Sequence, residues 1–235
     1  MAEEIKVMSE GGYRYSLDPF LLAGFCSVTR YEAVADLGAG SGILPLLLWH
    51  LFRPKVIHAI EIQRPLYDEA ESTISRHGLS GQINLLGGDV REVAELLPSQ
   101  SCQVVVTNPP YRLPGKGRLA PDSERAAARH ELHGGLDDFL KATAYLLGDG
   151  GRFYVVYLAE RLTDLLEGMR RHRLEPKRLR CVHGRSADVA KMVLVEGRKG
   201  GRPGLRLEAP LIVYEGEEYS PEVQAIYDRF RELWD

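Results

Sequence analysis

Residues 32–52 read EAVADLGAGSGILPLLLWHLF, and this stretch decides the fold. A short apolar run ends at Asp36 and Leu37, the glycines Gly38, Gly40 and Gly42 follow, and a strongly apolar helical stretch begins directly after them. Glycines between a strand and a helix let the backbone turn sharply and approach a ligand closely. The spacing is GxGxG, whereas dinucleotide sites use GxGxxG, and the acidic Asp36 would repel a pyrophosphate. The loop therefore favours a ligand with an ammonium or sulfonium group, with a purely structural turn as the alternative.

Short β-rich runs alternate with helical patterns on both sides of this stretch. The helical stretch at 44–52 is apolar all round, and apolar residues recur at helical spacing at 65–77 and 162–169. Strands are predicted at residues 32–37, 56–61, 83–86, 104–107, 152–158, 179–182, 192–195 and 210–214. This alternation is typical of a doubly wound, Rossmann-like α/β fold with a mostly parallel seven-stranded sheet. Residues 191–214 show a strand, a glycine-rich turn and a strand, so we expect the sheet to end there in an antiparallel hairpin.

The length of 235 residues suits one main domain with short extensions. We expect residues 1–30 to form an N-terminal cap over the ligand site and residues 31–215 to form the main domain. Ser220 and Pro221 resemble a helix start, and apolar residues follow at helical spacing. Residues 216–235 are therefore predicted to end in a helix that packs on the domain.

Composition excludes several classes of protein. The chain is 44% hydrophobic and 27% charged, which argues against disorder. Cys26, Cys102 and Cys181 are far apart and form no CxxC pair, so neither a zinc site nor a secreted disulfide framework is indicated. The N-terminus lacks a signal pattern, and the longest apolar run, residues 43–51, is too short to cross a bilayer. We expect a cytoplasmic protein without a metal or a membrane partner.

Two acidic residues follow the next two predicted strands. Glu61 ends the second strand, 25 positions after Asp36, where a carboxylate can bind ribose hydroxyls. Asp89 follows the third strand and could accept a hydrogen bond from an adenine amino group. In an open parallel sheet these strand ends line one crevice, so we assign both residues, with the adjacent Ile62 and Val90, to the ligand site. For either carboxylate taken alone, a helix cap or a loop carboxylate is the alternative.

The fourth strand ends in Thr107-Asn108-Pro109-Pro110-Tyr111. Two prolines hold the backbone in an extended turn and remove two hydrogen-bond donors, so acceptor groups are left facing the same crevice. A structural proline turn in which Tyr111 only packs is the alternative.

With these residues in order, the chain resembles the class I S-adenosylmethionine-dependent methyltransferases, in particular the branch with an Asn/Asp-Pro-Pro-Tyr motif that methylates amino groups. The resemblance covers roughly residues 13–214. It implies S-adenosylmethionine as cofactor and a planar, conjugated nitrogen as the methyl acceptor. It also implies that Asn108, Pro109, Pro110 and Tyr111 are the catalytic residues and that Asn108 contacts the cofactor as well. The side-chain oxygen of Asn108 and the carbonyl of Pro109 would accept hydrogen bonds from the NH2 group, and Tyr111 would stack on the planar group. Geometry and preorganised acceptors would then supply most of the rate.

The segment GYRYSLDPFLLA at residues 12–23 is similar to the region before the first strand in the tRNA (valine) adenine N6-methyltransferase family. The resemblance implies that Asp18 lies near the methionine end of the cofactor. Pro19 departs from the family pattern, where a small residue is more usual. An amphipathic helix capped by Asp18 is the alternative for this segment.

Basic residues follow the Asn-Pro-Pro-Tyr motif. Residues 111–206 carry 20 Lys and Arg against 12 Asp and Glu, although the whole chain has a net charge of −3. When a base of a nucleic acid enters the site, basic side chains nearby must bind the phosphates of its backbone. RNA-binding candidates are Arg112, Lys116, Arg118, Arg125 and Arg129. Residues 170–185 form a second basic cluster, and residues 198–202 a third.

We therefore predict methyl transfer to the N6 amine of an adenine in RNA, with tRNA as the expected partner, by a monomer or homodimer. Two alternatives share the same chemistry: methylation of a protein glutamine at N5, and methylation of another base amino group, such as guanine N2 in rRNA. Enzymes of the glutamine class carry a helical N-terminal domain, and only about thirty residues precede the first predicted strand, too few for a typical domain.

Overall fold

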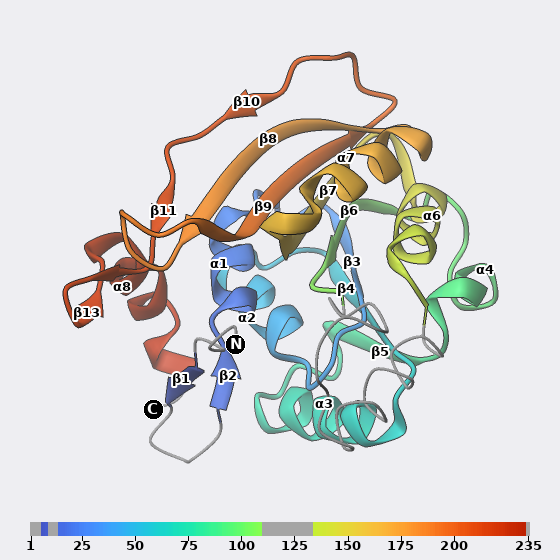
Figure 1. The fold of residues 1–235 in the computed structure, drawn as a ribbon. Helices are drawn as coiled ribbons and strands as arrows, with labels where there is room; N and C mark the ends of the chain where they lie inside the picture. Colours follow the sequence, from blue (N-terminus) through green and yellow to red (C-terminus); the bar gives the residue numbers. More distant parts are fainter. Residues whose placement is uncertain (1–5, 9–13, 110–133, 234–235) are drawn as a thin grey trace, which may run out of the picture.

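The centre of the fold is a sheet of nine strands, in the order β10-β8-β9-β7-β6-β3-β4-β5, with β11 also beside β8 (Figure 1). The computed structural model describes residues 6–8, 14–109 and 134–233. The strands are β3 (Ala33–Leu37), β4 (Val56–Glu61), β5 (Ile83–Gly87), β6 (Cys102–Thr107), β7 (Leu147–Leu158), β8 (Leu174–His183), β9 (Ala190–Lys199), β10 (Arg206–Leu207) and β11 (Leu211–Ile212). Every residue of β3 is buried, as expected for a central strand covered on both faces.

All neighbouring pairs from β5 to β7 are parallel, and β9 is antiparallel to both of its neighbours. The predicted doubly wound, mostly parallel sheet with a terminal antiparallel hairpin is therefore confirmed. Seven strands span the sheet, and the two-residue strands β10 and β11 extend it beyond β8.

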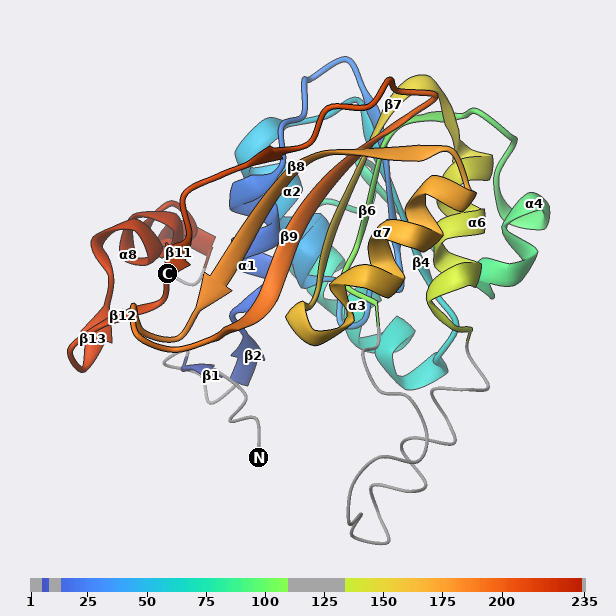
Figure 2. The ribbon, with the colours of Figure 1, turned by 45° about the horizontal axis from the view of Figure 1, so that its top comes forward.

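The hairpin lies earlier in the chain than we predicted. It joins β8 to β9, whereas residues 206–212 run parallel to β8 on its outer side (Figure 2). The physical reason is that β9 has no open edge: Val195 pairs with Val155 of β7 on one side and with Leu179 of β8 on the other. The chain that follows the glycine-rich turn at 200–204 can add only to the outer edge of β8. The expectation of a hairpin within residues 191–214 was wrong.

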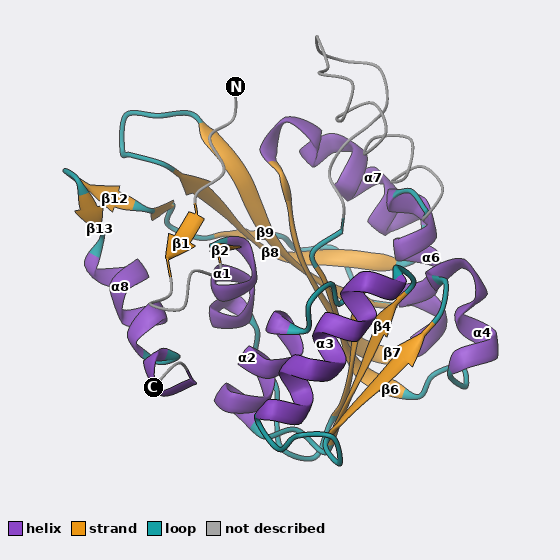
Figure 3. Ribbon diagram, turned by 90° about the horizontal axis from the view of Figure 1, so that it is seen from below, coloured by secondary structure: helices purple, strands orange, loops and turns teal. Residues whose placement is uncertain are grey.

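Helices cover both faces of the sheet (Figure 3). One face packs against α1 (Asp18–Phe25), α2 (Ile43–Phe52), α3 (Arg64–Arg76) and α8 (Pro221–Asp228). The other packs against α4 (Val93–Leu96), α6 (Leu136–Leu146) and α7 (Leu162–Arg171). Alternate residues of β6 supply the two cores: Val104 and Val106 face one, Val105 the other. α6 was not predicted from the sequence.

The helices near the two ends of the described chain pack together. Outside the central sheet, small antiparallel pairs form between β1 (Lys6–Met8) and β2 (Arg14–Ser16), and between β12 (Tyr214–Glu215) and β13 (Glu218–Tyr219). Ser220 caps α8 by accepting the Val223 N–H at 3.3 Å. The Phe20 ring of α1 lies 5.5 Å from the ring of Tyr227 and 5.6 Å from that of Phe230. The expected division into cap, main domain and C-terminal helix stays a prediction. In the described ranges, no helix is long and apolar enough to cross a membrane.

Candidate active site

The glycine loop between β3 and α2 depends on three left-handed residues. Gly38, Gly40 and Gly42 have φ angles of +75°, +56° and +83°, which L side chains rarely adopt. A Cβ on Gly42 would lie 3.1 Å from the Cβ of Ala70 in α3, and one on Gly38 would lie 3.3 Å from the Phe139 ring. A Cβ on Gly40 would meet no described atom within 4 Å. Packing therefore explains two of the glycines, whereas Gly40 turns bare backbone towards open space, as a ligand site requires.

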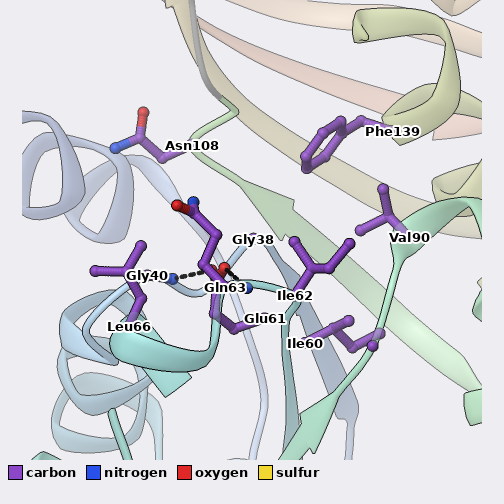
Figure 4. Close-up of a pocket in the computed structure, with 11 residues that line it drawn as sticks. Gly38, Gly40, Ile60, Glu61, Ile62, Gln63, Leu66, Val90, Asn108 and Phe139 are labelled. Carbon is purple, nitrogen blue, oxygen red and sulfur yellow. Dashed lines mark hydrogen bonds between the residues drawn. The ribbon is translucent and has the colours of Figure 1, made fainter. Parts of the chain in front are cut away.

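Glu61, at the end of β4, holds the glycine loop in place. Its side chain is only 4% exposed. One carboxylate oxygen accepts the Gly40 N–H at 2.8 Å, and the other accepts the Gln63 N–H at 2.8 Å (Figure 4). The Ile60 carbonyl also accepts the N–H of Gly38 at 2.9 Å. The first two strand ends are thus tied into one rigid unit.

Asp36 is the most unusual charged residue of the site. Its side chain is fully buried, and neither carboxylate oxygen has a hydrogen-bond partner within the described part of the chain. Burial, and then the nearby charge of Glu61, raise the pKa of Asp36 well above its ordinary value. A buried carboxylate without a partner costs stability, and such groups concentrate at functional sites. The ammonium group of an amino-acid ligand would supply the missing donors and the opposite charge.

A cavity of about 190 Å³ lies at the carboxyl ends of β3 to β6. Figure 4 shows Val90 and Phe139 on one side, Gln63 and Leu66 on the other, and Asn108 above the glycine loop. Of the residues assigned from sequence, those that line it are Gly38, Gly40, Glu61, Ile62, Val90 and Asn108. Those described residues that do not are Asp18, Asp36, Gly42, Asp89 and Pro109.

Sequence reasoning missed several lining residues, among them Gln63, Leu66, Gly88 and Phe139. The first three are close in sequence to Glu61 and Asp89, so their positions beside assigned residues could have indicated them. Phe139 gave no such signal, because it lies on the unpredicted helix α6 and reaches the site only through tertiary packing.

Asp89 sits at the start of a short 3-10 helix, η1 (Val90–Glu92), and acts as its N-cap. Its carboxylate accepts the Arg91 backbone N–H at 2.8 Å and also binds the Arg91 guanidinium. The cap interpretation of Asp89 therefore holds in this structure. Its neighbours Gly88 and Val90 line the cavity, so the cap lies at the wall of the ligand site.

The end of β6 is fixed to the glycine loop. The buried Thr107 hydroxyl donates to the Leu37 carbonyl at 2.7 Å. This bond locks the two central strand ends together just before Asn108, which is partly exposed, and Pro109, which is buried. Outside the described residues lie Pro110, Tyr111 and the candidate RNA-binding residues Arg112, Lys116, Arg118, Arg125 and Arg129.

Asp18 does not cap α1. Leu17 occupies the N-cap position, and Asp18 is the first helical residue. A carboxylate in the first turn interacts favourably with the helix dipole. Pro19 is tolerated next to it because the first turn of a helix needs no N–H donor there. The departure from the family pattern at Pro19 thus leaves the helix intact.

The second basic cluster is largely neutralised by ion pairs. Arg171 contacts Glu167 at 2.7 Å, and Arg178 contacts Glu196 at 2.6 Å. Further pairs join Arg170 to Glu175, Arg178 to Glu208 and Arg180 to Glu222. In the third cluster, the Lys199 ammonium donates to the carbonyls of Ala144 and Leu147 at the end of α6. The sequence runs of arginine therefore overstate the cationic surface.

This chain is similar in sequence to curated proteins and similar in fold to a solved structure. A tRNA1(Val) (adenine(37)-N6)-methyltransferase from Erwinia tasmaniensis is 29% identical over 151 residues, which are 64% of this chain and 60% of that protein. The protein of that name from Tolumonas auensis is 28% identical over 225 residues, or 91% of this chain and 87% of its own length. A solved structure described as a predicted O-methyltransferase from Agrobacterium tumefaciens shares the fold with a TM-score of 0.74 and 22% identity, covering 90% of this chain and 96% of that one.

The aligned part of this chain thus spans 60% of the length of the Erwinia relative and most of the Tolumonas one. The family model of the methyltransferase small domain matches residues 19–166. This range contains the glycine loop, Glu61, Asp89 and Asn108, and all of α1 except its first residue, Asp18. The chain belongs to the methyltransferase small domain family.

Proposed function

We propose that this chain transfers a methyl group from S-adenosylmethionine to the exocyclic N6 amine of an adenine in tRNA. The observation that carries the proposal is that Asn108 lines the same cavity as Gly40 and Glu61. An amide acceptor beside a glycine loop and a rigidly held carboxylate is the arrangement that amino-group methylation needs. The names of the relatives from Erwinia and Tolumonas supply the nucleotide and the RNA class.

The residues fit the cofactor. Buried Asp36 lacks a donor, and an ammonium group would provide one. The Glu61 carboxylate offers an acceptor for ribose hydroxyls, and the backbone of Gly40, which carries no side chain, leaves space for the ribose. The side chains of Ile62, Val90 and Phe139 supply apolar walls for a base. S-adenosylmethionine, when bound, would supply a methyl group on a sulfonium sulfur: the amine nitrogen bonds to the methyl carbon, the carbon–sulfur bond breaks, and S-adenosylhomocysteine leaves.

Asn108 carries the central catalytic role in this proposal. Its side-chain oxygen accepts a hydrogen bond from the adenine NH2 group, which turns the nitrogen lone pair towards the methyl group. The Pro109 carbonyl is the second acceptor. Thr107 fixes both by its bond to Leu37, so the acceptors need no reorganisation during the reaction. Tyr111 is proposed to stack on the target base, and Asp18 to approach the methionine end of the cofactor.

The RNA contacts belong to the same proposal. The five basic residues at 112–129 follow Asn108 directly in the chain, so phosphates bound by them would flank a base at the site. We also propose the cytoplasm as the place of the reaction, because the names of the relatives from Erwinia and Tolumonas point to a tRNA substrate.

Transfer of label from S-adenosylmethionine tests the function. The protein is offered tRNA from cells that lack this activity, ribosomal RNA and a release-factor protein in parallel, and the RNA products are digested to nucleosides. The expected result is label in N6-methyladenosine from tRNA. Label in N2-methylguanosine, or in the protein alone, would keep the chemistry of Asn108 and overturn the substrate. A heat-denatured sample of the same protein provides the background.

A further inference from the structure

Arg91 makes an unusually complete set of contacts with Asp89. Its backbone N–H donates to one carboxylate oxygen at 2.8 Å, and its Nε donates to the other at 2.9 Å. A second guanidinium nitrogen binds that same oxygen. The Asp89 side chain is only 12% exposed, whereas that of Arg91 is 44% exposed. Arg91 therefore encloses the carboxylate from the solvent side and fixes the plane in which it lies.

This pair lies where two walls of the cavity meet. Val90, between the two residues, lines the cavity, and the Gly88 N–H donates to the Glu61 carbonyl at 3.1 Å. On the other side is the start of α6, where Asp138 accepts the Gly135 N–H at 2.9 Å and Phe139 lines the cavity. A Cβ on Gly134 would lie 3.6 Å from a Val90 methyl group, so η1 and the start of α6 are in contact.

Several acidic groups of the described chain act on Arg91. The hydrogen bond to Asp89 and its charge, followed by the charges of Asp138 and Glu92, raise the pKa of Arg91. Without the guanidinium, the Asp89 carboxylate would lose its hydrogen bonds to a cation while carboxylates of like sign remain nearby. The guanidinium of arginine is planar and binds a carboxylate through several donors, so it fixes the orientation of that carboxylate. The mobile ammonium group of lysine does not.

We propose that Arg91 is a positioning residue that holds the Asp89 carboxylate ready to accept a hydrogen bond from the adenine amino group of the cofactor. This role of Arg91 rests on the proposal that S-adenosylmethionine is the cofactor, and it would explain how the site selects the adenine base of that cofactor. A carboxylate has about four acceptor sites, so it can bind further donors beside a guanidinium. A site built to hydrogen-bond an NH group rejects analogues that lack it.

The test measures ligand preference, not turnover. S-adenosylhomocysteine is compared with S-inosylhomocysteine, which carries a carbonyl oxygen where adenine has its amino group. Dissociation constants come from calorimetry on the full chain. We expect the unaltered protein to prefer the adenine ligand by about 30-fold, the value of one hydrogen bond to a charged group. In Arg91→Gln this preference should fall to about 3-fold, mainly through weaker binding of the adenine ligand.

Three further variants and a control show whether Arg91 acts through Asp89. In Asp89→Asn the preference should also fall, and adding Arg91→Gln should then lower it no further, because the pair acts as one unit. Arg91→Lys should resemble Arg91→Gln, since an ammonium lacks the planar guanidinium geometry. Arg206→Gln is the matched control: Arg206 also pairs with a carboxylate two residues away, Glu208 at 2.7 Å, on the outer strand β10.

Three outcomes would overturn the proposal. If Arg91→Gln weakens the binding of both ligands by the same factor, Arg91 only stabilises the fold. Tighter adenine binding would show that Arg91 competes with the base for Asp89. No binding of either ligand by the unaltered protein would overturn the cofactor assignment as well. None of these measurements involves RNA, so a result against the role of Arg91 does not affect the proposed methyl acceptor, which the labelling experiment tests separately.

Discussion

The two halves of the sheet treat their charged side chains in opposite ways. At the carboxyl ends of β3 and β4, Asp36 has no hydrogen-bond partner among the described residues and Glu61 binds only backbone N–H groups in the contacts observed. On β8, Arg178 and Arg180 each pair with glutamates. The first half keeps negative charge available for a ligand, whereas the second half neutralises its charge internally.

The contrast shows that charge in a sequence is a poor guide to charge at a surface. The basic cluster at 170–185 is conspicuous in the sequence, yet several of its partners lie on distant strands and helices, such as Glu222 of α8 bound by Arg180. A single buried carboxylate is less conspicuous and more informative. A buried carboxylate without a partner lowers the stability of the fold, so its presence indicates a function that requires it.

The largest effect should come from the ligand half. Asn108→Ala removes the preorganised acceptor, and we expect methyl transfer to fall by at least 10²-fold. Binding of S-adenosylhomocysteine should stay within about 3-fold, because Gly40 and Glu61 are unaltered. Single-turnover rates and calorimetry measure the two effects. Near-normal turnover would remove Asn108 from the mechanism.

Asp36→Asn should have the next largest effect. Losing the charge opposite an ammonium group should weaken cofactor binding by about 30-fold. The effect on the ligand-free protein should depend on pH. Because the folded-state pKa of Asp36 is raised above its ordinary value of 3.8, the folded protein holds this proton to higher pH than the unfolded chain does. The free energy of unfolding should therefore decrease as pH rises through that window.

The Asn variant carries no titrating group at this position, so its stability should decrease less over the same pH window. Urea denaturation of both proteins from pH 4 to 8 provides the comparison, with and without S-adenosylhomocysteine. If the free energies of unfolding of the two proteins change in parallel with pH, the pKa of Asp36 is not raised in the folded state as its burial indicates.

The smallest effect concerns the basic residues. Replacing Lys116 and Arg118 by Ala should weaken tRNA binding about 10-fold at low salt and reduce the salt slope by roughly 1.5 to 2. Arg170→Gln with Arg171→Gln should leave tRNA affinity nearly unchanged, because both arginines already have acidic partners. Fluorescence titrations at several salt concentrations measure both. The reverse result would place the RNA on the β8 side of the molecule.

Local patterns were enough to predict the parallel half of the fold. The strand at 56–61 was located to the residue, and the glycine loop and Glu61 were recognised because each is marked by residues adjacent in sequence. The hairpin was misplaced because strand pairing depends on which edge is open, and this is a property of the whole sheet. Phe139 was missed for the same reason, since only packing brings α6 to the cavity.

The sequence by itself determined the doubly wound sheet, the sharp glycine turn and the acidic and amide residues at successive strand ends, because a parallel sheet places those ends along one edge. Only the tertiary structure decided which charges pair and which stay available. Arg178 meets Glu196 and Arg91 encloses Asp89, but Asp36 receives no donor from the described chain. Ion pairing depends on distances of a few ångströms between side chains, and sequence separation does not set those distances.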